Sequence, residues 1–496
     1  MAVYKMPKFQ KSSVFGESRC ENQRGTQLDL FEMSDSILKI EGAFFWADEE
    51  GLKENSVAGT LEIAENGRST LSLVGLMIDQ EKPEGLFKTI EIDPERCIIG
   101  MLKDSRHVLL RRLSSGSTTY SSTIDHQTIH AREAVVFRQL EDLLDLDKVT
   151  KFSNSLSSLE GWISSPSVIA ERAKNGNVTV RSRKQRMRVF RFENKTVRLR
   201  SDIRYNALSK IRRQSVTLSQ DSSLEVQPKK FCDLKFVQDE MHLFEELVLL
   251  TADAHITLPW PTVHYGKESG TYYFERRQIS AIKKIEINTP WVTLNSDSID
   301  IGALLSNLKV QKDILGPGLY LYLGIRRGTG LYLENQFSTA IFGLESLHRR
   351  AGVSPAEPKL EDKVKRILAC VTNPKDHTWL EGRLRNAAEP NLAKRLSQTF
   401  SELDIGLDPK TLNKFSEECA KVRNEIAHFG GQRDGGYDEF ILRMHVLNRA
   451  VRPLYHAVLL NRIGLDMKYI HAYFHTAPIS YGIRRSLQEA GLSFKS

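Results

Sequence analysis

The chain has few cysteines, and their placement argues against two common roles. It contains five in 496 residues, namely Cys20, Cys97, Cys232, Cys370 and Cys419, and no two are spaced as Cys-x-x-Cys. An odd number of widely separated cysteines does not suit a disulfide framework, and the absence of Cys-x-x-Cys pairs argues against a zinc knuckle. This cysteine usage fits a reducing compartment.

Long apolar runs are also absent. No stretch approaches the roughly 18 to 20 uninterrupted apolar residues that a membrane-spanning helix needs. The lysines within residues 1–11 are not followed by the apolar segment of a secretory signal. We therefore expect a cytoplasmic protein with no membrane partner. Its length predicts two or three domains, and its 40% hydrophobic and 27% charged residues are typical of chains that fold.

Motifs for nucleotides and metals are missing as well. Glycines crowd into residues 316–330, but no Gly-Lys-Ser or Gly-Lys-Thr follows them, so we predict flexible turns and not a P-loop. His126 with His130 and His471 with His475 are each four residues apart, yet neither pair has an evident third ligand. We predict structural roles for these histidines and expect no metal or other cofactor.

Positive charge is concentrated in one part of the chain. The net charge is +8, and between Arg181 and Arg213 thirteen lysines and arginines stand against two acids. The rest of the chain is therefore slightly acidic. Basic and apolar residues alternate in this basic window, so strands would place the basic side chains largely on one face. The basic residues singled out are Arg183, Lys184, Arg186, Arg188, Arg191, Arg198 and Arg200.

Such a basic face would suit phosphate binding, and Phe190, Phe192 and Tyr205 would stack on bases if they were exposed. The alternative is a solvated sheet face whose aromatic residues belong to the core.

The first 300 residues have the pattern of a β-rich region. Residues 1–28 are polar and lack periodicity, which predicts a flexible arm. In residues 29–300, short apolar runs separated by Gly, Asn, Asp and Pro predict an antiparallel sandwich or barrel with a few helices. Residues 133–146 have the apolar spacing of a helix. The expected strands include 40–46, 59–63, 70–74, 97–102, 108–113, 178–180, 187–192, 196–199 and 271–276.

The pattern changes at residue 301. From there to residue 496, apolar residues recur at steps of three and four, which predicts amphipathic helices packed as a bundle. The expected helices are 300–308, 333–349, 360–371, 391–403, 411–429 and 437–462. The fold class is therefore α+β and multidomain, with a β-rich region followed by an all-α domain.

One of these helices carries a candidate catalytic motif. An Asp followed by Pro at residues 408–409 predicts its start, and a Gly pair at residues 430–431 predicts its end. Arg423, Asn424 and His428 avoid the centre of its apolar stripe, and Asn424 and His428 share one face because they are four residues apart. The negative end of the helix dipole favours the protonated form of His428.

An arginine and a histidine suffice for one reaction without a metal. RNA supplies its own nucleophile, the 2′-hydroxyl, so His428 could move a proton while Arg423 holds the phosphate oxygens. The products would be a 2′,3′-cyclic phosphate and a 5′-hydroxyl. The alternative is structural, because a helix-terminal histidine often caps free carbonyls.

The motif carries a family resemblance. Arg-Asn-Glu-Ile-Ala-His, ending at His428, resembles the Arg-(polar)-x3-His signature of the HEPN ribonucleases, and residues 333–350 resemble the opening helix of such domains. Residues 40–46 (Ile-Glu-Gly-Ala-Phe-Phe-Trp), 59–63 and 71–75 are similar to the ApeA family of bacterial anti-phage defence proteins.

The resemblance implies a metal-independent endoribonuclease that acts as a homodimer or higher homo-oligomer on RNA, with tRNA as one candidate. Arg423 and His428 would be the catalytic pair, Asn424 would orient them, and Glu334 or Glu345 would supply a supporting acid. The β-rich region would sense a phage-derived trigger. Two alternatives stay open: a non-catalytic HEPN dimer that binds RNA or a partner protein, and a scaffold in which the β-rich region does the essential binding.

Overall fold

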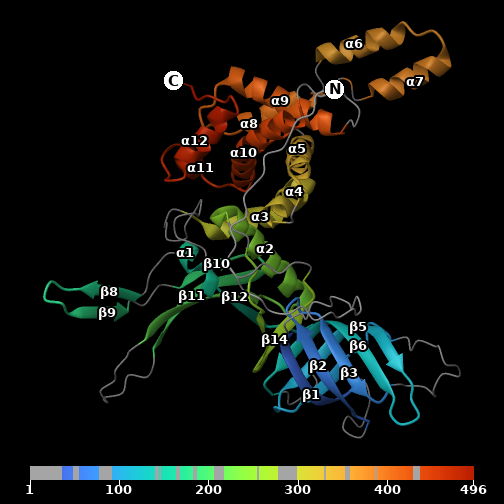
Figure 1. Cartoon of the computed structure of the whole chain (residues 1–496), viewed down its shortest axis with the longest axis vertical. Coiled ribbons are helices and arrows are strands. Elements are labelled where there is room, and N and C mark those ends of the chain that lie inside the picture. Colours follow the sequence, from blue (N-terminus) through green and yellow to red (C-terminus); the bar gives the residue numbers. More distant parts are fainter. Residues whose placement is uncertain are drawn as a thin grey trace, which may run out of the picture.

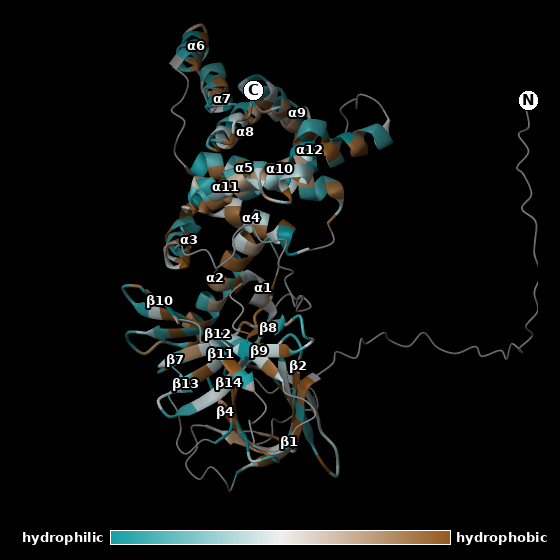
Figure 2. Ribbon diagram, turned by 90° about the vertical axis from the view of Figure 1, so that its left-hand side faces the viewer, coloured by the Kyte–Doolittle hydropathy of each residue, from teal (hydrophilic) through white to brown (hydrophobic). Residues whose placement is uncertain are grey.

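The strands gather at one end of the molecule and most of the helices at the other (Figures 1 and 2). The structure is a computed structural model. It describes residues 36–47, 55–77, 92–139, 145, 147–163, 168–182, 187–205, 217–253, 256–276, 299–328, 331–351, 358–385, 387, 389–427 and 436–495.

The first six strands close into a barrel, as one of the two expected β architectures. Their order is β6-β3-β2-β1-β4-β5, and β5 pairs back onto β6 along most of its length. All of these pairings are antiparallel. The strands are β1 (Ser36–Trp46), β2 (Val57–Ala64), β3 (Ser69–Val74), β4 (Ile98–Leu102), β5 (His107–Thr119) and β6 (His126–Phe137).

Alternating burial along the barrel strands explains why the sequence pattern predicts them as strands. On β2, Leu61 and Ile63 are fully buried while their neighbours are partly exposed, and Leu71 and Leu73 repeat this on β3. These side chains belong to a hydrophobic cluster made only of barrel residues and Met77. The barrel therefore has a core of its own.

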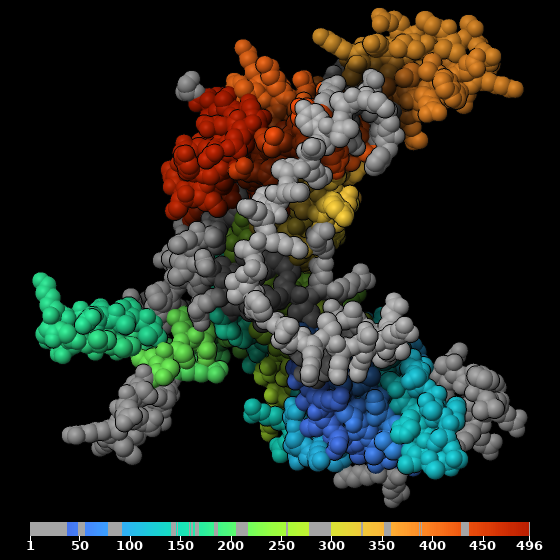
Figure 3. Space-filling model, viewed as in Figure 1, coloured from blue at the N-terminus to red at the C-terminus, as the bar shows by residue number. Residues whose placement is uncertain are grey.

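The same sheet continues beyond the barrel from β6, and its part outside the barrel, from β14 to β10, is called the second sheet below. The first half of β6 pairs with β3 and its second half pairs with β14, after which the order is β14-β13-β7-β12-β11-β10. A hairpin of β8 (Val168–Arg172) and β9 (Val178–Ser182) forms a separate sheet that projects from the body (Figures 1 and 3). The other elements here are β7 (Lys151–Ser155), η1 (Ser157–Leu159), α1 (Glu160–Ile163), β10 (Arg188–Arg191), β11 (Lys195–Tyr205), β12 (Leu218–Pro228), β13 (Thr262–Tyr265) and β14 (Glu268–Phe274).

The helix predicted for residues 133–146 is wrong in its described part, because residues 133–137 belong to β6. This half of the strand is buried on both faces: Ala134 and Val136 enter the barrel core, while Val135 and Phe137 enter the neighbouring core. A strand covered on both faces reads as a continuous apolar run without alternation. Such a run cannot be told from a buried helix by its periodicity.

The C-terminal region is helical, and each of the six expected helices is present: five agree within two residues at each end, while the helix expected at 300–308 extends to Leu315. The full set is α3 (Ile301–Leu315), α4 (Pro317–Arg326), α5 (Leu333–Arg350), α6 (Pro358–Ala369), α7 (Pro374–Leu384), α8 (Leu392–Ser401), α9 (Pro409–Ala427), α10 (Tyr437–Arg462), α11 (Met467–His475) and α12 (Ser480–Glu489). The flexible turns predicted within residues 316–330 are wrong for Pro317–Arg326, since Pro317 opens α4 behind Gly316. Among the described helices, none combines the length and apolarity needed to cross a membrane.

One helix of the β-rich region joins the two ends of the molecule. It is α2 (Leu234–Ala252), which is capped by Asp233 and contributes to a core shared by the second sheet and the helical region. Two ion pairs fasten α3 to it: Lys309 Nζ lies 2.9 Å from Glu240, and Lys312 Nζ lies 2.8 Å from Glu246. The apolar core therefore runs without a break from the second sheet into the helices.

Candidate active site

The motif lies at the end of α9, whose start and packing follow from its sequence. The backbone N–H of Thr411 donates to the Asp408 carboxylate at 2.9 Å, so Asp408 caps the helix as expected. The apolar stripe is buried, with Phe415 and Cys419 against the bundle core. The opposite face, with Lys421 and Asn424, is exposed to solvent.

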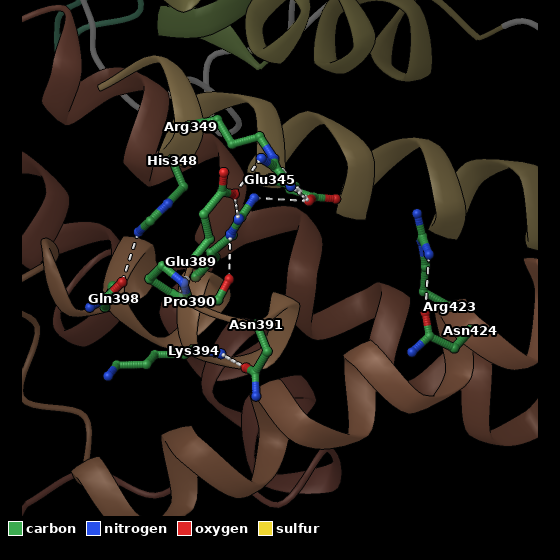
Figure 4. A network of polar contacts seen from close by, with 11 residues as sticks. Glu345, His348, Arg349, Glu389, Pro390, Asn391, Lys394, Gln398, Arg423 and Asn424 are labelled. Carbon is green, nitrogen blue, oxygen red and sulfur yellow. Dashed lines mark hydrogen bonds and ion pairs between the residues drawn. The ribbon is translucent and has the colours of Figure 1, made fainter. Parts of the chain in front are cut away.

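Arg423 extends from α9 toward α5 (Figure 4). Its side chain is half-buried, and the guanidinium carbon lies 4.5 Å from the centre of the Phe342 ring. Nη1 donates to the Asn424 side-chain oxygen at 3.0 Å. Nε is shielded from solvent and has no hydrogen-bond partner in the described part of the chain. The guanidinium is thus held by an aromatic face and an amide, and both leave its charge uncompensated.

A second arginine braces the motif helix against α10. Arg443 contacts the carboxylate of Glu425, the residue after Asn424, and lies 3.2 Å from Glu418. Sequence spacing does not point to Phe342 or Arg443, because they come from α5 and α10. Tertiary packing alone brings these residues to α9.

Only part of the predicted site is described. Arg423 and Asn424 lie side by side, and Asn424 is exposed. His428 follows Ala427, the last residue of α9, and lies outside the described residues. The pairing of Arg423 with His428 therefore remains a prediction from the sequence.

Of the two candidate acids, Glu345 belongs to an ion-pair network. The Arg395 guanidinium, itself buried, lies 3.1 Å from Glu345, contacts Glu389, and donates to the Pro390 carbonyl at 2.7 Å. Arg349 lies 3.1 Å from the same carboxylate. Figure 4 shows this cluster set apart from Arg423 and Asn424. Its contacts indicate that Glu345 ties α5 to α8.

Glu334 has a different setting, in the first turn of α5. Its carboxylate accepts a hydrogen bond from the Tyr437 hydroxyl at 2.9 Å. Tyr437 is the first residue of α10, so this bond joins the start of α5 to the start of α10, the next helix after α9.

The basic window is divided by the described boundaries. Arg183, Lys184 and Arg186 lie outside the described residues, while Arg188 and Arg191 lie on β10.

On β11 the expected alternation is present. Val197 and Leu199 are buried, whereas Arg198 and Arg200 lie 2.9 and 3.6 Å from the Glu225 carboxylate on β12. That acid therefore offsets part of their charge.

The aromatic residues beside the window are engaged by the protein. Phe190 is partly buried and packs so closely on α3 that a Cβ on Gly302 would lie 2.7 Å from its ring. Phe192 is also partly buried against the core. Phe190 and Phe192 therefore pack against the core, which favours a structural role for these two rings over stacking on bases.

The paired histidines lie in structural surroundings. His126 and His130 are on β6, and His130 Nδ1 lies 3.2 Å from the Thr70 hydroxyl oxygen. On α11 the rings of His471 and His475 are 4.2 Å apart, and His475 Nε2 lies 3.0 Å from the Ile405 carbonyl oxygen. Across the described ranges, no three His, Cys, Asp or Glu residues gather as a metal site would need.

Comparison with known proteins gives two matches that follow one another along the chain. The family model described as ApeA N-terminal domain 1 matches residues 39–308, and the one described as Apea-like HEPN matches residues 339–469. The second match contains the whole of α9 and the motif residues Arg423, Asn424 and His428. No curated protein matches the chain.

Proposed function

The chain belongs to the ApeA N-terminal domain family. Because an Apea-like HEPN domain follows in the same chain, we propose that the protein is a metal-independent endoribonuclease of anti-phage defence. HEPN domains are generally associated with ribonuclease activity, and the two matches together support a defence-related HEPN nuclease.

The observation that carries the proposal is that Arg423 has no charge partner among the described residues. It stands near the end of α9 in the matched HEPN region, with no ion pair to any described carboxylate and with a shielded Nε that lacks a partner. An arginine whose only role was to fix a helix would be expected to pair with an acid or a carbonyl. A guanidinium with a donor that no described residue engages suits the non-bridging oxygens of a phosphodiester.

The chemistry then follows from what RNA already contains. His428 accepts the proton of the 2′-hydroxyl or gives one to the leaving 5′-oxygen, and the 2′-oxygen attacks the adjacent phosphorus. Negative charge grows on the phosphate oxygens, where Arg423 stabilises it. Asn424 holds the guanidinium in position through its 3.0 Å contact. The bond to the 5′-oxygen breaks, leaving a 2′,3′-cyclic phosphate and a 5′-hydroxyl.

Two copies place their motif helices face to face around RNA, with tRNA as one candidate substrate. The barrel and second sheet respond to a phage-derived trigger. Arg188, Arg191, Arg198 and Arg200, with the remaining basic residues of the window, contribute to binding the RNA backbone.

The test is cleavage of a labelled RNA by the purified full-length chain in excess EDTA. We expect products with 5′-hydroxyl and cyclic phosphate ends, and no cutting of the same sequence made with 2′-deoxyribose. Arg423→Ala and His428→Ala should each reduce the rate at least about a hundredfold, the scale seen when one transition-state partner is removed. Arg383→Ala, a change of an exposed arginine on α7, is the matched control.

Circular dichroism of all three variants should equal that of the unaltered protein. Cleavage that requires added Mg²⁺, or that survives in both motif variants, would contradict the mechanism. If the unaltered protein and all variants bind RNA but none of them cuts it, a non-catalytic HEPN domain is favoured instead. In cells, sequencing of RNA ends with the unaltered protein and with His428→Ala identifies the substrate.

A further inference from the structure

A cavity of about 320 Å³ opens where α4, α10, α11 and α12 meet the end of α2. Three arginines line it, namely Arg326, Arg449 and Arg452, together with the rings of Tyr322 and Tyr473. None of its lining residues comes from α9, so it is distinct from the motif. The five helices are labelled in Figure 1.

Two of the arginines already have partners. Arg326 Nη2 donates to the Asp253 carbonyl at 2.9 Å and contacts the carboxylate of the same residue. Arg449 lies 3.1 Å from Glu489, a carboxylate that it shares with Arg485. Glu489 is thus shared by two arginines, and Asp253 already binds Arg326.

Arg452 has no such partner. No hydrogen bond or ion pair joins its guanidinium to any residue in the part of the chain that the structure describes, and its Nε is shielded from solvent. Burial lowers the pKa of Arg452 and the nearby charge of Arg326 lowers it further, while the Asp253 carboxylate, which is bonded to Arg326, offsets this only in part. A half-buried cation beside another cation is costly unless an anion offsets it.

We propose that this cavity binds a phosphorylated small molecule, with the phosphate held by Arg452 and Arg449. The planar guanidinium groups match two oxygens of a phosphate at once. Tyr473 and Ile483 line the same cavity and offer an apolar surface for a ring. The volume lies at the small end of ligand pockets, about 300 to 1,000 Å³, which fits a ligand of the size of a nucleoside monophosphate.

The position of the cavity gives the ligand two regions to hold together. Asp253 follows α2 of the β-rich region, and His456 Nδ1 on α10 lies 3.2 Å from its carboxylate. His456 Nε2 lies 2.7 Å from the Leu250 carbonyl oxygen on α2. A bound phosphate ester would therefore contact the joint between the sheets and the bundle. This inference stands independently of the ribonuclease proposal.

The experiment is calorimetric titration of the full-length chain, in buffer free of phosphate, with adenosine monophosphate, inorganic phosphate and adenosine. We expect saturable binding of the monophosphate at one site per chain, and none of adenosine. Arg452→Gln should weaken binding at least tenfold. Arg383→Gln removes an exposed charge on α7 and should leave it unchanged.

A thermal melt separates binding from folding. Since Arg452 lacks a partner, Arg452→Gln without ligand should melt no lower than the unaltered protein, whereas an arginine that supports the fold would lower the melting temperature. Inorganic phosphate binding as tightly as the monophosphate would identify free phosphate as the anion and remove the role of the ring. The proposal is overturned if no probe saturates, or if Arg452→Gln binds as tightly as the unaltered protein.

Discussion

Arg423 and Arg452 share one property at the scale of single residues: each is a half-buried guanidinium whose Nε has no partner among the described residues. The sequence identified Arg423, because its relation to Asn424 and His428 is local on one helix. It did not identify Arg452, because Arg326 and the rings of Tyr322 and Tyr473 come to that residue from α4 and α11. Sequence spacing reports neighbours on one element and not those brought together by packing.

Substitutions of the two candidate acids, Glu345 and Glu334, should differ in whether they change the stability of the fold or the rate of cleavage. Glu345→Gln leaves the buried Arg395 short of a charge partner, so we expect a loss of about 1 to 3 kcal/mol in the free energy of unfolding. Glu334→Ala removes only an exposed hydrogen bond to Tyr437, so its melting temperature should not change.

The cleavage rate should show the opposite ranking, with the larger loss in Glu334→Ala. If the start of α10 must be held for the motif to act, Glu334→Ala should slow cutting about tenfold to a hundredfold, because small misplacements near a reacting group cost that much. Melting curves and initial rates measured on both variants decide the matter. Equal melting temperatures for the two variants would show that Glu345 does not tie α5 to α8.

Asp253 gives a prediction about pH. Burial raises its pKa, but the hydrogen bond and charge of His456 and the charges of Arg326 and Arg452 outweigh this, so the pKa lies below the ordinary 3.8. A carboxylate with a depressed pKa stabilises the fold above the unfolded value, about 3.9, and this contribution is lost as the pH falls through the folded pKa.

Asp253→Asn should therefore cost about 1.5 to 3 kcal/mol at pH 7, the scale of a hydrogen bond to a charged group. The difference from the unaltered protein should shrink as the pH approaches 3. Denaturant unfolding at a series of pH values measures it, and a difference that stays constant down to pH 3 would contradict the assignment.

Among the secondary-structure elements, the sequence predicted best those with one buried face. The range expected for α10, 437–462, equals the helix found, and α5 and α9 agree within two residues. The failures have physical causes. No residue of α7 is buried, so it has no apolar stripe to reveal it, and α4 is apolar on much of its surface with Gly318 and Gly324 within it.

The close approach of α5 and α10 yields a prediction at this scale. A Cβ added to Gly343 would overlap the Tyr455 hydroxyl, which itself donates to the Gly318 carbonyl. Gly343→Ala should therefore lower the free energy of unfolding by about 1 to 3 kcal/mol through overpacking.

Gly324→Ala on α4 is the matched control, since a Cβ there would have no atom within 4 Å. It should raise stability by about 0.5 to 1 kcal/mol, because alanine loses less backbone freedom in a helix. Urea titration of both variants tests the pair. A neutral Gly343→Ala would mean that the two helices can move apart without cost.

For the molecule as a whole, the two hydrophobic clusters divide the chain differently from the change of secondary structure. The barrel has one core, while the second sheet and the helices share another through α2. The sequence placed the change from strands to helices near residue 300, but periodicity does not show which elements share a core. The family matches, at residues 39–308 and 339–469, also leave α2 with the β-rich region.

Two core substitutions should therefore spread over different parts of the molecule. Leu61→Ala in the barrel and Leu247→Ala in α2 each remove a fully buried side chain, at a cost of about 2 to 5 kcal/mol. In hydrogen–deuterium exchange, Leu61→Ala should increase exchange in β1, β2 and β3 and leave α5 and α10 unchanged. Leu247→Ala should increase exchange in both β12 and α10. Identical maps for the two variants would mean that the cores unfold as one.

Strand β6 serves both cores, with Ala134 and Val136 turned one way and Val135 and Phe137 the other. Most strands at a protein surface tolerate polar replacements at every second position, but this stretch has no position of that kind. A single inserted residue there would exchange the contents of the two interiors, sending each set of side chains into a space shaped for its neighbour. Deep mutational scanning should therefore find a short block in which insertions and polar residues are rejected at successive positions, without the usual alternation.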